Sequence, residues 1–160
     1  MRRGPRAHLA VAAAWLLLPA LPATAVQSED SDDQALLADA DYSAGLAALK
    51  AGDAGAALHR FQSALKRFPE AADLHNELGF AYRRLRQMDK AFEHYKRALA
   101  LRPEHRGAHE YIGEAYLMVG DVVNAEKHLA ALRAICLLPC AEFEDLRKAI
   151  GAHRAQATPR

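Results

Sequence analysis

The sequence lacks the motifs on which most enzyme chemistry depends. It contains no glycine-rich loop that could cradle a phosphate, and no serine stands in the setting of a hydrolase nucleophile. No pair of carboxylates can be distinguished from ordinary surface charge. The only two cysteines in the 160 residues, Cys136 and Cys140, are not followed by the histidine that covalent haem attachment needs. We therefore expect neither catalysis nor a bound cofactor.

An excess of charge of one sign is lacking too. The chain has 21 Lys+Arg and 20 Asp+Glu, which gives a formal net charge of +1. No stripe of Lys and Arg with interleaved aromatic residues occurs. This balance argues against nucleic acid or an acidic membrane surface as a partner.

Long apolar runs are confined to the start of the chain. Arg2, Arg3 and Arg6 precede the run Leu9–Leu18, which is followed by the small residues Ala23–Ala25. A basic start, an apolar middle and small residues at −3 and −1 are typical of a secretory signal peptide. The run is shorter than the roughly 20 residues that a membrane-spanning helix needs, and retention as an anchor is the alternative. We expect export by the general secretory route and a periplasmic or secreted protein.

Removal of the predicted signal peptide, residues 1–25, changes the charge balance. It takes away three of the 21 basic residues and none of the 20 acidic ones, so the formal net charge becomes −2. About 135 residues are then left, which is enough for one domain. Residues 26–34, VQSEDSDDQ, are acidic and polar, and we expect a disordered leader there. Residues 154–160 are expected to form a loose tail.

A period of 34 residues runs through the rest of the chain. In residues 72–105, small and large apolar residues recur at helical spacing, Arg86-Gln87 divides the segment and Pro103 ends it. A shift by 34 residues in either direction finds related residues. The sets are Gly45, Ala47, Ala57, Phe61, Ala64 and Pro69; Gly79, Ala81, Ala91, Tyr95, Ala98 and Pro103; and Gly113, Ala115, Ala125, Leu129, Leu132 and Leu137.

This pattern resembles the tetratricopeptide repeat (TPR) family, whose 34-residue repeats each form a helix, a turn and a helix. The run HEYIGEAYLMVGD and the Cys-x-x-x-Cys end look like those of small exported bacterial TPR proteins. The resemblance implies an all-α solenoid with repeats at 38–71, 72–105 and 106–139. Amphipathic residues 140–153 predict a C-terminal capping helix, so the TPR domain would span 35–153.

Local signals predict how each repeat is built. Glycine at 45, 79 and 113 would let two helices approach closely, and the first helix would run from 35 to 50. Asp53 follows a turn at Gly52 and is suited to cap the second helix, which would end near Phe68. In the central repeat, Arg86-Gln87 stands where the neighbouring repeats have Gly-Asp, so a residue with a side chain must adopt the left-handed conformation there.

In the resembling family, the first helices line a concave groove that takes an extended peptide or a partner's helix. The resemblance therefore implies a protein-interaction module or scaffold. The partner-binding residues map to Tyr42, Leu46, Leu49, Lys50, Asn76, Phe80, Arg83, Arg84, Glu110, Glu114, Leu117 and Met118, with Asp39 and Asp73 also facing inward. Tyr42, Leu46, Leu49, Phe80, Leu117 and Met118 would form an apolar strip, Arg83 and Arg84 a basic centre, and Glu110 and Glu114 an acidic end. Some members hold a C-terminal carboxylate in this groove, but Glu110 and Glu114 do not suit that ligand. The alternative is that several of these residues pack against neighbouring helices or the leader.

Cys136 and Cys140 leave three interpretations open. In an exported protein they favour a disulfide that clamps the last repeat to the capping helix. A redox-active pair is an alternative, although such pairs usually have two intervening residues. A metal-handling site with His128 is another. His75 and His109, like His94 and His128, are 34 residues apart, which reports the repeat, so we interpret them as structural. Self-association into a larger assembly is a further possibility.

Overall fold

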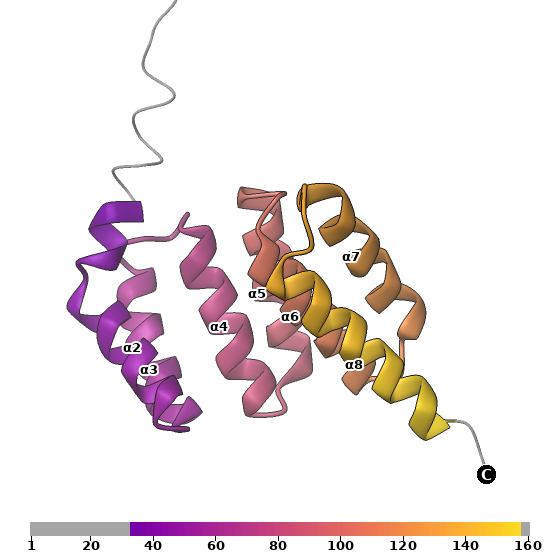
Figure 1. The fold of residues 1–160 in the computed structure, drawn as a ribbon. Helices are drawn as coiled ribbons and strands as arrows, with labels where there is room; N and C mark the ends of the chain where they lie inside the picture. Colours follow the sequence, from indigo (N-terminus) through magenta and orange to yellow (C-terminus); the bar gives the residue numbers. More distant parts are fainter. Residues whose placement is uncertain (1–32, 158–160) are drawn as a thin grey trace, which may run out of the picture.

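The computed structural model describes residues 33–157, and the predicted signal peptide and residues 26–32 lie outside this part. The described chain is all α-helical, and its helices lie side by side in chain order (Figure 1). After a helical segment at 33–37, the helices are α2 (Ala40–Lys50), α3 (Ala54–Leu65), α4 (Ala72–Arg84), α5 (Met88–Leu101), α6 (Arg106–Met118), α7 (Val122–Ile135) and α8 (Ala141–Ala157). The predicted fold class, a solenoid of helical hairpins with a C-terminal cap, is confirmed.

Three hairpins follow one another: α2 with α3, α4 with α5, and α6 with α7. The second helix of each hairpin also packs on the first helix of the next, so the apolar surfaces join. The tight turns within the hairpins use the left-handed conformation, with φ of 83° at Gly52, 60° at Arg86 and 80° at Gly120. Arg86 thus adopts the predicted unfavourable conformation. Asp53 caps α3 by accepting a hydrogen bond from the backbone N–H of Ala56, as predicted.

The predicted helix from 35 to 50 is interrupted at Asp39. The Asp39 backbone is extended, and its side chain accepts hydrogen bonds from the N–H groups of Asp41 and Tyr42, which starts α2 anew. Arg67, just after α3, donates to the same carboxylate. Leu36, 1% exposed, holds the preceding segment against the core, so residues 33 and 34 are helical and do not belong to a leader.

Other ends differ from the prediction by a few residues. The second helix of the first repeat ends at Leu65 instead of near Phe68. The capping helix begins at Ala141 and continues to Ala157, beyond the predicted end at residue 153. Element ends depend on capping contacts that a repeat pattern does not contain.

Glycines 45 and 79 stand where two helices of one hairpin touch. A Cβ at Gly79 would lie 2.6 Å from the ring of Tyr95, and one at Gly45 would clash with the ring of Phe61. Both rings are 0% exposed, so they fill the space between helices that only glycine leaves open. The predicted close approach is therefore found in the first two repeats.

The third repeat reaches the same packing by another route. Leu129 replaces the aromatic residue there, and the nearest atoms to a Cβ at Gly113 belong to Leu146 of α8, at 2.6 Å. Leu146 is 0% exposed and packs in a cluster with Leu117, Leu132 and other residues of α6, α7 and α8. Consequently α8 packs against α6 as well as α7 and crosses in front of α6 in Figure 1.

Candidate functional site

The residues predicted to bind a partner all lie on α2, α4 and α6, the first helices of the repeats. We call the surface that these three helices form the first-helix face. α2 contacts α4, and α4 contacts α6. Leu46, Lys50, Arg84 and Met118 are exposed; Leu49, Phe80, Arg83, Glu110 and Glu114 are partly buried; Tyr42, Asn76 and Leu117 are buried.

The predicted apolar strip is interrupted because two of its residues are used inside the fold. Tyr42 packs on Phe61 with ring centroids 5.9 Å apart. Leu117 lies in the cluster that α8 forms with α6 and α7. Tyr42 and Leu117 therefore do not belong to an exposed strip. Exposed apolar side chains are found toward its two ends, at Leu46 and Met118.

The predicted basic centre is partly neutralised by the protein itself. Arg83 donates to Glu114 at 2.5 Å, and its guanidinium lies 5.2 Å from the ring centroid of Phe80 and 5.5 Å from that of Tyr111. Its side chain is only 11% exposed, so this arginine joins α4 to α6. Arg84 is the exposed cation of the pair. Tyr111 was missed because it stands between the inward positions of the repeat pattern.

Acidic side chains follow the α4 part of the first-helix face. Asp73 accepts from His105 and Arg102, and these contacts lower the pKa of its carboxyl group. Glu77 has only a hydrogen bond from the side-chain amide of Asn76, at 3.2 Å. Burial raises the pKa of Glu77 to about 7. Glu77 was also missed by sequence reasoning, although it is adjacent to the inward position of Asn76.

The α6 part of the face is acidic as well. Burial, followed by the negative charges of Glu114, Asp145 and Glu142, raises the pKa of Glu110 to about 7. Glu142 and Asp145 belong to the first turns of α8. The capping helix therefore covers Leu117 and adds negative charge beside Glu110, which the pattern of the three repeats does not contain.

Two histidines pair between the helices of the central repeat. His75 Nε2 lies 3.0 Å from the carbonyl oxygen of Pro69, and His75 Nδ1 lies 3.0 Å from His94 Nδ1. Because a carbonyl oxygen can only accept, His75 carries its proton on Nε2, and its Nδ1 accepts from His94 Nδ1–H. The ring of Tyr82 stacks on His94. Both histidines are thus neutral in this arrangement.

The third repeat contains the same arrangement. His109 and His128 have Nδ1 atoms 2.9 Å apart, and His109 Nε2 donates to the carbonyl of Pro103. Burial, followed by the charges of His109 and Lys127, lowers the pKa of His128 to about 4. His128 thus faces His109, and its Nδ1 is already hydrogen-bonded. The equal spacing in sequence comes from a packed pair that occurs twice.

These pairs predict a loss of stability in acid. The pKa of His128 is lower in the folded chain than the ordinary 6.5, so its contribution is complete above pH 6.5 and is lost as the pH falls toward 4. His128→Asn keeps an N–H donor toward His109 but cannot titrate. From pH 7.5 to pH 5, we expect the free energy of unfolding in urea to fall by about 1 to 2 kcal/mol less in His128→Asn than in the parent chain.

Glu77 and Glu110, whose pKa values are raised, contribute with the opposite sign: their stabilisation is lost as the pH rises through about 7. Both proteins share this contribution, so it cancels in the comparison. His59→Asn, at an exposed histidine of α3, is the matched control and should leave the pH dependence unchanged. Equal acid sensitivity of His128→Asn and the parent chain would contradict the pairing.

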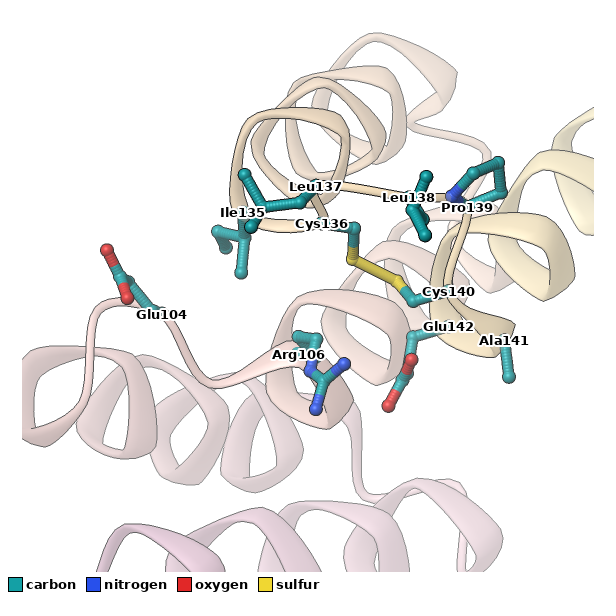
Figure 2. A pocket seen from close by; sticks show the side chains of 10 residues that line it. All are labelled: Glu104, Arg106, Ile135, Cys136, Leu137, Leu138, Pro139, Cys140, Ala141 and Glu142. Atoms are coloured by element: carbon teal, nitrogen blue, oxygen red, sulfur yellow. A yellow bond between two sulfur atoms is a disulfide. The ribbon is translucent and has the colours of Figure 1, made fainter.

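Cys136 and Cys140 lie side by side in the loop between α7 and α8. Figure 2 shows their sulfur atoms facing each other, and the two Cα atoms are 6.0 Å apart. Leu137 and Leu138 between them are 100% and 80% exposed. The loop borders an open depression of about 800 Å³, which Glu104 and residues at the ends of α6, α7 and α8 also line.

Neither a metal site nor a membrane span is found in residues 33–157. No three His, Cys, Asp or Glu side chains in this range gather closely enough to hold a metal ion. None of the helices in the same range is long and apolar enough to cross a membrane.

The arrangement of stacked helical hairpins defines an α-solenoid repeat protein. The family model for the tetratricopeptide repeat matches residues 42–104 and 81–136, which together make up more than half of the chain. The chain therefore belongs to the tetratricopeptide repeat family. No curated protein sequence matches it at a significant level.

Solved structures share the fold at low sequence identity. The first TPR of Spaghetti (RPAP3) bound to the HSP90 peptide SRMEEVD has 21% identity, a TM-score of 0.63 and coverage of 74% of this chain and 93% of that one. The TPR2B domain of yeast Sti1 in a pHsp70 complex has 18% identity, a TM-score of 0.65 and coverage of 79% and 98%. PcrH in complex with the chaperone binding region of PopD has 22% identity, a TM-score of 0.62 and coverage of 82% and 96%.

Proposed function

We propose that this chain is a protein-interaction module that holds a segment of a partner protein against its first-helix face. The observation that carries the proposal is the mixture of side chains there. Exposed Leu46 and Met118 are found together with the aromatic pair Phe80 and Tyr111, whose ring centroids are 5.1 Å apart. Apolar groups accompanied by a few oriented polar groups are typical of binding sites. Family membership and the peptide complexes of the structural relatives support the same role.

The sequence supports placing this module in an exported protein. Residues 1–25 have the composition of a signal peptide, and Cys136 and Cys140 are positioned for a disulfide that would persist only in an oxidising compartment. We infer that this bond is structural and fixes α8 against the third repeat. The intact mass of the protein recovered from the bacterial envelope fraction checks both points: it should equal that of residues 26–160 without the two thiol hydrogens. Retained residues 1–25 with free thiols would contradict the assignment.

A photo-crosslinking experiment tests the binding role. A benzophenone amino acid is placed at Leu46 or Met118, on the first-helix face, or at Val123, a 66% exposed residue of α7. Irradiation in the native compartment should give protein adducts from the first two positions and none from Val123. Adducts from Val123 alone, or equal adducts from all three positions, would place the binding surface elsewhere.

Charge reversal of Arg83 is unsuitable as a test of binding. A carboxylate at this position would meet Glu114 directly and would leave the rings of Phe80 and Tyr111 without their cation. The variant would lose stability whether or not a partner binds there. Arg84 is exposed and can be replaced without this complication.

A further inference from the structure

Two carboxylates on the first-helix face have no cation opposite them. Within residues 33–157, neither Glu77 nor Glu110 forms an ion pair. Glu77 accepts one hydrogen bond, from Asn76, and Glu110 is surrounded by the negative charges of α6 and α8. Both charges act on Tyr111 and raise the pKa of its hydroxyl in addition to the effect of burial. The two glutamates therefore act on the same part of the face.

The arginines that lie near these glutamates are already bound elsewhere. Arg83 is bound to Glu114. Arg102, the other arginine near this surface, is bound to Asp73 and Asp33. These positive charges of α4 and of the loop after α5 are thus in ion pairs, and Glu77 and Glu110 are left over. Uncompensated charge at a partly buried position is unfavourable unless a ligand supplies the opposite sign.

A buried polar atom with no partner lies beside Glu77. Asn76 is 4% exposed, and its Nδ2 donates to the Glu77 carboxylate. This contact fixes the orientation of the amide, because the reverse orientation would bring two oxygen atoms together. Its Oδ1 then faces away from Glu77 and receives no hydrogen bond. A carboxylate and an amide oxygen in adjacent positions both require a donor.

We infer that the first-helix face takes a cationic segment, a stretch of partner protein in which a Lys or Arg side chain lies against Glu77, Glu110 and the Asn76 oxygen. The inference rests on the proposed function and gives the chemical class of the partner. An ammonium or guanidinium group carries several donors and can satisfy the carboxylates and the amide oxygen together. The adjacent rings of Phe80 and Tyr111 suit the apolar stem of such a side chain.

The same charges exclude other occupants. An acidic peptide or a C-terminal carboxylate would meet Glu77, Glu110 and the carboxylates at the start of α8. The stretch at residues 29–33 of this chain contains Glu29, Asp30, Asp32 and Asp33 and is disfavoured for the same reason. A basic segment of another protein is the occupant that matches the charge of the face.

Two synthetic peptides test the assignment. They are amidated, fluorescein-labelled and identical except that one has lysine wherever the other has glutamate. In fluorescence anisotropy titrations with the purified chain, the lysine peptide should bind at least about tenfold more tightly and lose affinity as salt is added. The double replacement Glu77→Gln and Glu110→Gln should remove about tenfold of that affinity. Glutamine keeps the shape of each side chain and removes an uncompensated charge, so the fold should be kept. Glu93→Gln, at an exposed residue of α5, is the matched control and should change nothing.

Each other outcome overturns the inference. Equal binding of both peptides, or a preference for the glutamate peptide, would show that the charge of the face does not select the partner. Failure of both peptides to bind, or loss of lysine-peptide binding because copies of the chain associate in sedimentation experiments, would also reject a cationic segment. Photo-crosslinking from Leu46 and Met118 is read separately, so the proposed function can survive when this inference fails.

Discussion

Gly79→Ala should lower the free energy of unfolding by about 2 kcal/mol, although alanine is the better helix former. A Cβ at this position of α4 would lie 2.6 Å from the ring of Tyr95, which is 0% exposed and has no empty space to move into. Overpacking of this kind destabilises by about 1 to 3 kcal/mol and sometimes more. The gain in helix propensity, about 1 kcal/mol, opposes it but is smaller. Urea unfolding monitored by circular dichroism measures the difference.

Gly151→Ala is the matched control. Gly151 lies in α8, and a Cβ added there would have no atom of a neighbouring element within 4 Å, so the same replacement should raise stability by up to about 1 kcal/mol. Tyr95→Leu, which shortens the opposing side chain, should make Gly79→Ala less harmful than it is in the parent chain. Equal effects of the alanine replacement at positions 79 and 151 would contradict the close-contact role of Gly79.

The 34-residue period predicted the fold because its residues act within a single hairpin. Gly79 faces Tyr95, and Gly45 faces Phe61, at a fixed separation along the chain. Such contacts can be found by comparing one repeat with the next. The break at Asp39 could not be found in this way, because it depends on a carboxylate that caps α2 and binds Arg67, an arginine from outside the repeat pattern of first helices.

The candidate site was only partly predictable, for a related reason. The repeat pattern places Leu117 on the first-helix face, but only the packing of α8 shows that it is covered. It presents Arg83 as a free cation, whereas Glu114 of the next repeat neutralises it. The charge around Glu110 depends on α8, which follows the last repeat and has no equivalent to compare with. Contacts between repeats and with the cap decide which polar groups are left for a partner.

Leu146→Ala should lower the free energy of unfolding by about 3 kcal/mol, the largest effect that we expect from a single replacement. Leu146 is 0% exposed and fills the space over Gly113 that an aromatic ring of the second helix occupies in the other repeats. Truncation of a buried leucine removes apolar contact and leaves a cavity, which together destabilise by about 2 to 5 kcal/mol. Leu138→Ala, at an 80% exposed leucine before α8, is the matched control and should have almost no effect.

The double variant Gly113→Ala with Leu146→Ala distinguishes direct contact from a general weakening of α8. In the parent chain, a Cβ at Gly113 would lie 2.6 Å from Leu146, so Gly113→Ala alone should destabilise by about 1 kcal/mol. Once Leu146 is shortened, the added methyl group enters the vacated space and helix propensity favours it, so the same replacement should stabilise by about 1 kcal/mol. This reversal of sign, measured by urea unfolding of the four proteins, requires that Leu146 and Gly113 touch. Additive effects would mean that α8 is anchored elsewhere and that Leu117 is not covered in the way we describe.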